Sequence, residues 1–260
     1  MSGDEGQARI TWLDADVPFN AHYGDAYYAR SDGLAEVMQV FLAGNGLPGR
    51  WLSHAHDAPF VIGELGFGTG LNFVATARAW QGEAAMHPGG QLRYVSFERH
   101  PLRADTMRRA MARWPDVSRL AEQLCDRWPR SPAAGSVIDL SIDAAPAAPA
   151  GPPVAPIVLN VIIGDAQETL ARWSGAAHAW YLDGFAPARN PQLWSPEILR
   201  SVAAHTAPGG TFSTYTAAGH VRRSLTAAGF RVCKVPGFGQ KRERLEGTLL
   251  PEDTRPEANA

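Results

Sequence analysis

Apolar and polar positions along the chain predict strands and helices in alternation. Residues 59–65 and 92–98 carry the apolar runs and period-two patterns expected of two core strands. Each is followed by apolar residues at helical spacing, over about 71–80 and from Pro101 onward. A strand, a helix and a second strand of this kind form one βαβ unit, so these two strands are expected to be parallel.

The same alternation continues in the second half of the chain. Strands are expected at 157–163, 179–182, 211–216 and 230–235, helices at 167–171, 196–205 and 218–228, and a turn at Pro208-Gly-Gly. This pattern predicts an α/β fold of the Rossmann-like type, with a mainly parallel sheet covered by helices on both faces. Ligands of such sheets bind at the carboxyl ends of the strands, and we therefore expect the functional residues there.

A segment rich in Ala and Pro, residues 131–156, interrupts the pattern. Its part at 144–156 is composed almost entirely of Ala, Pro and Gly, which form neither a helix nor a strand ladder comfortably. We interpret this part as a loop joining two strands at 137–142 and 157–163. A linker between two domains is the alternative. The α/β pattern resumes after the loop without a new start, which favours a single domain.

We expect this domain to occupy residues 1–260. Residues 1–57 are interpreted as a lead-in with an aromatic cluster (Tyr23, Tyr27, Tyr28) and a helix at 33–42. The α/β core is expected over 58–250, followed by a disordered tail at 251–260.

Composition narrows the class of protein. The 260 residues are 45% hydrophobic and 19% charged, which is ordinary for a globular protein. The chain lacks an apolar stretch of about 20 residues, and its acidic N-terminus is unlike a signal peptide, so we expect a cytoplasmic protein without membrane contact. We also expect a monomer.

Two distant cysteines suggest neither a disulfide framework nor a metal site. A net charge of −2 argues against general coating of nucleic acid, although local basic patches remain compatible with binding.

The run from Phe60 to Phe73 is the strongest candidate site, because a buried strand ends there in an acidic, glycine-rich turn and leads into a helix. The glycines let the backbone approach a ligand closely, and the helix N-terminus offers free N–H groups. Leu71 replaces the third glycine of the dinucleotide fingerprint, which favours S-adenosylmethionine (SAM) over NAD. The residues of this run that we expect to bind the cofactor are Glu64, Gly66, Phe67, Gly68, Thr69, Gly70 and Asn72. A glycine-rich loop without a ligand is the alternative.

Carboxylates stand at the ends of four expected strands, and all four are expected to bind the cofactor: Glu64, Glu98, Asp165 and Asp183. Glu64 could hold the amino group of a methionine moiety. Glu98 is placed to accept the ribose hydroxyls of a nucleoside; the alternative is a surface carboxylate that pairs with Arg99 or Arg103. Asp165 is placed to accept an adenine amine, and it is also suited to cap the helix that follows.

The loop after the strand at 179–182 is expected to be stiff, since two prolines, one glycine and four aromatic residues lie within residues 180–194. Asp183, Phe185 and Pro187 could form a cradle in which a flat base stacks on Phe185 and a polar group meets Asp183. A structural turn, with Asp183 bonding loop amides, is the alternative.

Several of these motifs resemble those of a known family. Residues 64–73, 96–98, 181–191, 208–211 and 237–243 are similar to the methyltransferase part of the MnmC family, as are the lead-in motifs at 25–28, 33–36 and 40–45. The resemblance implies a class I SAM-dependent methyltransferase that N-methylates 5-aminomethyl-2-thiouridine at the wobble position of tRNA. Many members also carry a C-terminal flavin-dependent oxidase domain. This chain resembles a stand-alone form, so no FAD is expected.

Methyl transfer to an amine requires alignment of the nitrogen with the methyl carbon, and we assign Asp183 to orient the amine first and to take its proton second. Lys241 and Arg242 are expected to contact tRNA within a basic segment that also contains Arg222, Arg223, Lys234 and Arg244, unless this segment is an ordinary solvated face. Two rival functions remain: a SAM-dependent methyltransferase of a small molecule or protein, and a non-enzymatic or NAD-binding Rossmann protein.

Overall fold

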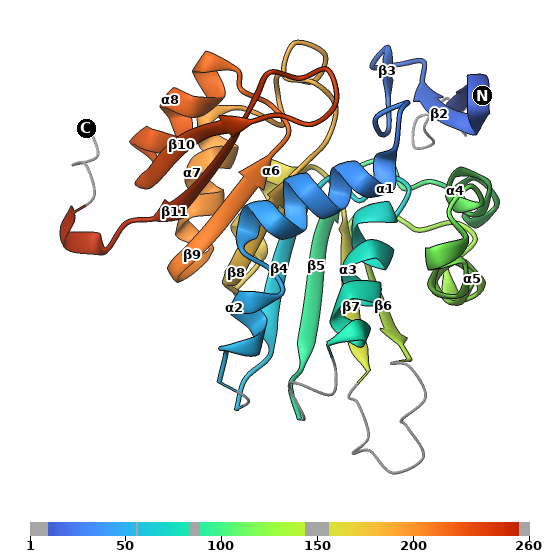
Figure 1. Cartoon of the computed structure of the whole chain (residues 1–260), viewed down its shortest axis with the longest axis horizontal. Helices are drawn as coiled ribbons and strands as arrows, with labels where there is room; N and C mark the ends of the chain where they lie inside the picture. Colours follow the sequence, from blue (N-terminus) through green and yellow to red (C-terminus); the bar gives the residue numbers. More distant parts are fainter. Residues whose placement is uncertain (1–9, 56, 84–88, 144–155, 255–260) are drawn as a thin grey trace.

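A computed structural model describes residues 10–55, 57–83, 89–143 and 156–254. Its centre is an eight-stranded sheet with the strand order β10-β11-β9-β8-β4-β5-β7-β6 (Figure 1). The strands of this sheet are β4 (Phe60–Leu65), β5 (Leu92–Glu98), β6 (Val137–Ile142), β7 (Ile157–Ile163), β8 (Ala177–Leu182), β9 (Thr206–Thr214), β10 (Phe230–Pro236) and β11 (Glu243–Leu249). The α/β architecture predicted from the alternation is confirmed.

The five central strands β7, β5, β4, β8 and β9 are parallel, and β6, β11 and β10 at the two sides run antiparallel to their neighbours. The sheet is therefore mixed, with a parallel centre. The strands β6 and β7 pair along their whole length, from Val137 opposite Ile162 to Ile142 opposite Ile157. This pairing confirms the interpretation of two joined strands over that of an interdomain linker; the middle of their connection lies outside the described residues.

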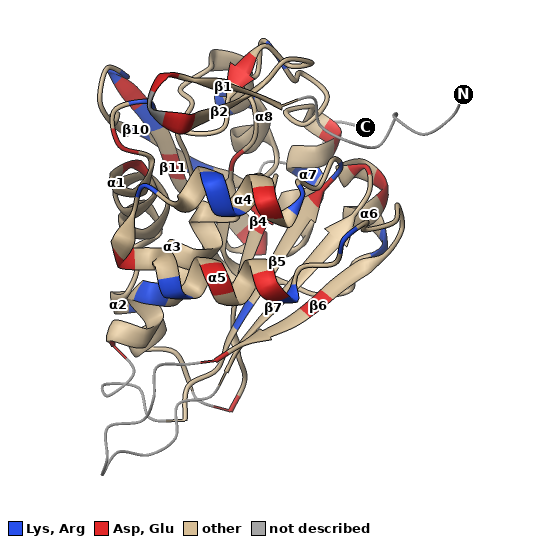
Figure 2. Cartoon of the chain, turned by 90° about the vertical axis from the view of Figure 1, so that its right-hand side faces the viewer, with Lys and Arg blue, Asp and Glu red and all other residues tan. Residues whose placement is uncertain are grey.

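Helices cover both faces of the sheet, as predicted. One hydrophobic cluster includes α3 (Leu71–Gly82), α4 (Ala104–Met111) and α5 (Ser118–Arg127). A second cluster, on the other face, includes α6 (Ala166–Arg172), α7 (Pro196–Ala204) and α8 (Gly219–Ala227). Figure 2 shows that α4 and α5 present charges of both signs to solvent. In the described residues, no helix combines the length and apolar character needed to cross a membrane.

The N-terminal segment builds a small second sheet above the carboxyl ends of the parallel strands (Figure 1). This sheet consists of β1 (Ile10–Leu13), β2 (Val17–Asn20) and β3 (Asp25–Ala26). Helix α1 (Gly33–Glu36) follows and continues as a π-helix (Val37–Leu42) and a 3₁₀ turn (Ala43–Asn45), before α2 (Gly49–Leu52). Further 3₁₀ turns lie at Asp14–Asp16, Pro115–Val117 and Glu252–Thr254. The segment packs into the same hydrophobic cluster as α3, so it is joined closely to the core.

Two expectations need correction, and a third lies mostly outside the described residues. The Pro208-Gly-Gly turn lies inside β9, where the pairing with β8 shifts register and absorbs the irregular backbone. Residues 243–249 form β11 rather than a solvated basic tail, because Leu245 and Leu249 are buried and Gly247 leaves room for the ring of Phe212. Most of the expected disordered tail, residues 255–260, lies outside the described residues.

Candidate active site

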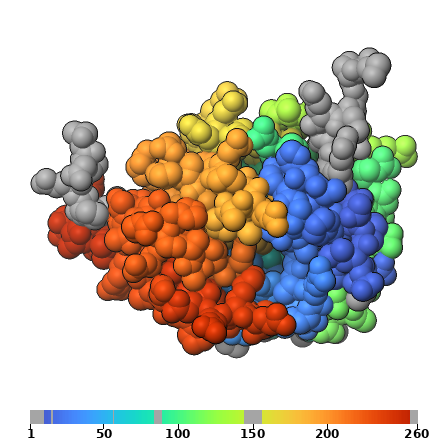
Figure 3. Space-filling view, turned by 90° about the horizontal axis from the view of Figure 1, so that it is seen from above, coloured from blue at the N-terminus to red at the C-terminus, as the bar shows by residue number. Residues whose placement is uncertain are grey.

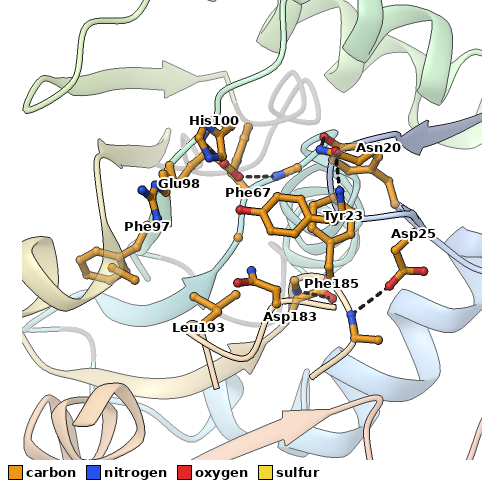
Figure 4. Close-up of a pocket in the computed structure, with 18 of the residues that line it drawn as sticks. Asn20, Tyr23, Asp25, Phe67, Phe97, Glu98, His100, Asp183, Phe185 and Leu193 are labelled. Carbon is orange, nitrogen blue, oxygen red and sulfur yellow. Dashed lines mark hydrogen bonds between the residues drawn. The ribbon is translucent and has the colours of Figure 1, made fainter. Parts of the chain in front are cut away.

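A cavity of about 1160 Å³ opens at the carboxyl ends of the parallel strands. Its walls come from the glycine turn after β4, the ends of β5 and β7, the loop after β8, and the N-terminal segment. Seen from above, the blue N-terminal segment and the light-orange loop after β8 meet over this edge of the sheet (Figure 3). The close-up of the cavity shows Asp183 and Phe185 on one side and Glu98 and His100 on another (Figure 4).

The glycine turn forms one wall of the cavity. Gly66, Gly68 and Gly70 all have positive φ angles (83°, 54° and 80°), which other residues rarely adopt. A Cβ atom on Gly66 would lie 3.3 Å from the backbone Cα of Gly184, and one on Gly68 would lie 3.2 Å from the ring of Tyr27. The turn therefore accepts only glycine at these positions and exposes its backbone. Of the residues expected to bind the cofactor here, those that line the cavity are Gly66, Phe67, Gly68, Thr69 and Asn72.

Gly70 and Glu64 do not line the cavity. Gly70 precedes α3 and faces Leu124 and Phe67. Glu64 is fully buried, and its Oε1 accepts a hydrogen bond of 2.8 Å from the side-chain amide of Asn72. Burial raises the pKa of Glu64 to about 8. The structure thus places Asn72 between Glu64 and the space in which we expected Glu64 to meet a ligand.

The same amide group of Asn72 also donates to Asp183 Oδ2, again at 2.8 Å. Asp183 follows directly after β8 and lines the cavity, and its Oδ1 accepts a hydrogen bond of 2.8 Å from the backbone N–H of Gly184. Burial raises the pKa of Asp183 to about 7, although both hydrogen bonds oppose this shift. A carboxylate that titrates close to neutral pH is suited to exchange a proton with a ligand. The structural-turn alternative is partly correct, because Asp183 does bond a loop amide.

Glu98 also faces the cavity. Its carboxylate accepts hydrogen bonds from the backbone N–H of Gly68 (3.0 Å) and from that of His100 (2.6 Å). The alternative of a surface ion pair is wrong for the described residues, since Arg99 pairs with Asp165 and Arg103 with Asp105. Glu98 thus ties the glycine turn to the end of β5 and keeps further lone pairs for a ligand.

Asp165 lies at the start of α6 and lines the cavity. Its Oδ1 accepts a hydrogen bond of 2.9 Å from the backbone N–H of Gln167, so it caps the helix as the alternative reading stated. Its Oδ2 lies 3.2 Å from Arg99 Nη1. Both oxygens already have partners, and an adenine amine would have to share one of them.

Phe185 is packed against the N-terminal segment. Its ring stacks on that of Tyr23, with centroids 4.6 Å apart and an interplanar angle of 26°, and meets the edge of Tyr27 at 5.0 Å. Asp25 Oδ2 accepts a hydrogen bond of 2.9 Å from the backbone N–H of Ala186. Tyr23, Tyr27 and Asp25 thus line the cavity, although the sequence analysis placed them only in a lead-in.

Of the remaining residues expected to contact the substrate, one lines the cavity and two do not. Lys241 lines the cavity and forms an ion pair of 2.9 Å with Glu36. Pro187 is buried and Arg242 is exposed, and neither lines the cavity. Glu36 was missed, because the sequence placed it only in an expected helix at 33–42 and assigned it no role. The one signal was its place in a motif, 33–36, shared with the MnmC family.

The comparisons with known proteins agree with this geometry. Residues 149–250 match a family model described as "S-adenosyl-L-methionine-dependent methyltransferase". The bifunctional tRNA 5-methylaminomethyl-2-thiouridine biosynthesis protein MnmC of Caulobacter vibrioides is 44% identical over 254 residues, which is 96% of this chain and 40% of that protein. The chain is thus similar to MnmC proteins over part of their length. MnmC of Stutzerimonas stutzeri is 43% identical over 93% of the chain and 34% of its own length.

The chain thus spans about two fifths or less of the length of these MnmC relatives. Among solved structures, MNMC2 from Aquifex aeolicus superimposes with a TM-score of 0.70 at 20% identity, covering 97% of this chain and 72% of that one. The superposition establishes the fold. The predictions of a Rossmann-like methyltransferase fold and of a resemblance to MnmC are confirmed.

The buried carboxyl of Glu64 has a measurable consequence for stability. Its pKa rises from 4.5 to about 8 on folding, so the folded protein binds this proton more tightly than the unfolded chain. Stability is therefore lost as pH rises between these two values. We expect Glu64→Gln to be more stable than the wild type at about pH 9, by roughly 1–3 kcal/mol, with the gain shrinking towards about pH 5.

Urea unfolding at both pH values provides the measurement. Glu168→Gln, at an exposed position on α6, is the matched control and should follow the wild type at each pH. If the difference between Glu64→Gln and the wild type were the same at both pH values, Glu64 would not carry the proton that we assign to it.

Proposed function

We propose that this chain is a SAM-dependent N-methyltransferase that converts 5-aminomethyl-2-thiouridine to 5-methylaminomethyl-2-thiouridine at the wobble position of tRNA. The family match to SAM-dependent methyltransferases and the name of the MnmC relatives support this reaction. The observation that carries the proposal is the carboxylate of Asp183, which faces the cavity beside the glycine turn and is held by Asn72. We propose further that the protein acts as a monomer in the cytoplasm.

The cavity fits the cofactor. The strictly glycine turn leaves its backbone open to a ligand, and Glu98 at the end of β5 offers lone pairs to two ribose hydroxyls. Asp165, which follows β7 and lines the cavity, would receive an adenine amine on an oxygen that it shares with a protein partner. Bound SAM supplies a methyl group on a positively charged sulfur, which makes the methyl carbon electrophilic.

The residues of the chain then act on the acceptor amine. An amine can attack only when it is neutral, so its ammonium form must first release a proton. Asp183 holds the amine by an N–H bond and takes up this proton, directly or through water. The nitrogen lone pair forms the new bond to the methyl carbon as the bond from that carbon to sulfur breaks. Burial of the site excludes competing water, and alignment contributes most of the rate.

The cations available for tRNA differ from the expected set. Lys234 is paired with Glu243 at 2.6 Å, and Arg244 is buried beside Glu246. Arg30 of the N-terminal segment lines the cavity and is exposed. We therefore add Arg30 to the residues proposed to contact tRNA phosphates, together with Lys241, Arg242 and the exposed α8 pair Arg222 and Arg223.

The direct test of the function is methyl transfer from labelled SAM to tRNA that carries 5-aminomethyl-2-thiouridine, followed by nucleoside analysis. We expect the label in 5-methylaminomethyl-2-thiouridine and its loss after RNase treatment of the acceptor. Label in a protein or a small molecule instead would establish the rival methyltransferase function. Binding of NAD in preference to SAM would contradict any methyltransferase reading.

Asp183→Asn keeps the shape of the loop but cannot accept the proton. Single-turnover methylation should fall by about 10²–10⁴-fold, while SAM affinity changes little. The wild-type rate should rise with pH through about 7, where Asp183 becomes ionised, and the variant should lose this rise. Asp139→Asn, at an exposed position on β6, is the control. Normal turnover of Asp183→Asn would reject its role.

Glu98→Ala removes an acceptor for the ribose hydroxyls and also the partner of two backbone amides. SAM affinity, measured by calorimetry, should weaken by about 1–3 kcal/mol. Asp105→Ala removes an exposed carboxylate near α4 and should leave the affinity unchanged. Equal affinity of Glu98→Ala and the wild type would remove Glu98 from the cofactor site.

Arg30→Ala removes one cation beside the mouth of the cavity. If Arg30 contacts a phosphate, tRNA affinity should fall for any wobble nucleoside, and the slope of log affinity against log salt should decrease by about one. Arg78→Ala, on α3 and paired with Asp116, is the control. An unchanged salt slope for Arg30→Ala would place the phosphates elsewhere.

A further inference from the structure

A side-chain cation already occupies one end of the cavity, next to Asp183. Lys241, between β10 and β11, reaches into the cavity, and its Nζ lies 2.9 Å from Glu36 Oε1. The same Nζ lies 4.0 Å from the centroid of the Tyr215 ring, a distance at which an ammonium is attracted to an aromatic face. Glu36 is largely buried, with 9% of its side chain exposed, whereas 43% of the Lys241 side chain is exposed.

The partners of Lys241 are fixed in place by other bonds. Glu36 Oε2 accepts a hydrogen bond of 3.1 Å from the backbone N–H of Ala29, which leaves Oε1 directed at the ammonium. The Tyr215 hydroxyl donates to the carbonyl oxygen of Gly184 at 2.8 Å, which holds its ring beside the loop that carries Asp183. An ammonium at this position therefore meets a prepared carboxylate and a prepared ring face.

Negative charge dominates around this position. Burial raises the pKa of Tyr215 well above its usual value, and the carboxylates of Asp183, Asp25 and Glu36 all add to this rise. The pKa of Asp183 is raised by Glu36 and lowered by Lys241, so both members of the ion pair act on Asp183. Three carboxylates thus act on the Tyr215 hydroxyl, and one of them, Glu36, forms the ion pair with Lys241.

The ammonium of lysine and that of an aminomethyl group are the same chemical group, a primary ammonium on a CH₂ carbon. We propose that Glu36 and the ring face of Tyr215 form the subsite that receives the acceptor's aminomethyl cation beside Asp183, with Lys241 occupying this place until the acceptor arrives. The inference rests on the proposed function and assigns the residues that recognise its substrate.

The subsite explains how an acceptor that is charged in water becomes reactive. Glu36 and Tyr215 bind the aminomethyl group in its ammonium form. One N–H proton then passes to the Asp183 carboxylate, which becomes a neutral acid, and the amine keeps the electron pair of that bond. Lys241 withdraws towards solvent, where its charge is available to a phosphate of the same tRNA. A wobble uridine without the aminomethyl group cannot replace Lys241 and is bound less tightly.

The test compares two anticodon stem-loop RNAs that carry 2-thiouridine at the wobble position, one with and one without the 5-aminomethyl group. Binding is measured without SAM, so the readout does not depend on turnover. The wild type should prefer the aminomethyl RNA by about tenfold. Glu36→Gln should reduce this preference to near one while leaving affinity for the unsubstituted RNA unchanged. Glu122→Gln, an exposed carboxylate on α5, is the matched control and should keep the preference.

Lys241→Met provides the second variant, because it removes the competing cation and leaves Glu36 uncompensated. Its preference for the aminomethyl RNA should increase. Thermal unfolding and SAM affinity show whether each variant is folded; if Glu36→Gln is not, Lys241→Met decides. The subsite would be overturned by a folded Glu36→Gln that keeps the preference, or by a folded Lys241→Met whose preference does not increase. Methylation by the wild type would still support the proposed function in that case. Absence of wild-type methylation of the aminomethyl RNA would instead reject the function itself.

Discussion

The site depends on one amide group that is held between two carboxyls. Asn72 donates 2.8 Å hydrogen bonds both to Glu64, at the end of β4, and to Asp183, after β8. β4 and β8 are neighbours in the parallel centre of the sheet, so their ends arrive side by side. The glycine turn then starts α3 where the second residue of the helix, Asn72, can reach both carboxyls. The side chain of Asn72 thus connects the ends of two paired strands with the start of one helix.

This arrangement also assigns different tasks to two buried acids. Glu64 does not line the cavity, and burial raises its pKa. Its contact with Asn72 therefore positions that amide and does not involve a ligand. Asp183 has access to the cavity and a pKa of about 7, so it can exchange a proton with a ligand. A buried pair of ionised carboxylates would repel each other, and the protonated state of Glu64 avoids this cost. The acid that we propose to react with the substrate, Asp183, is the one that lines the cavity.

Much of this organisation could be predicted from the sequence. The glycine turn, Glu98 and Asp183 were expected at strand ends because parallel strands bring their carboxyl ends to one edge. The position of Glu64 behind Asn72 could not be predicted, since it depends on which way the last side chains of β4 point. The part of the cavity wall that the N-terminal segment forms was also not predicted. Glu36 and Tyr215 are far apart in sequence and meet only through packing of the N-terminal segment over the sheet.

The central claim is that Glu64 and Asp183 flank Asn72 and titrate far above ordinary carboxyls. Carbon-13 NMR of side-chain carboxyls, followed over a pH titration of the wild type and of Glu64→Gln and Asp183→Asn, tests it most directly. The account predicts two carboxyls titrating near 8 and near 7, one of which disappears in each variant. If every carboxyl titrated in the usual range of about 4, the description of the site as a protonated positioning acid beside a near-neutral base would be contradicted.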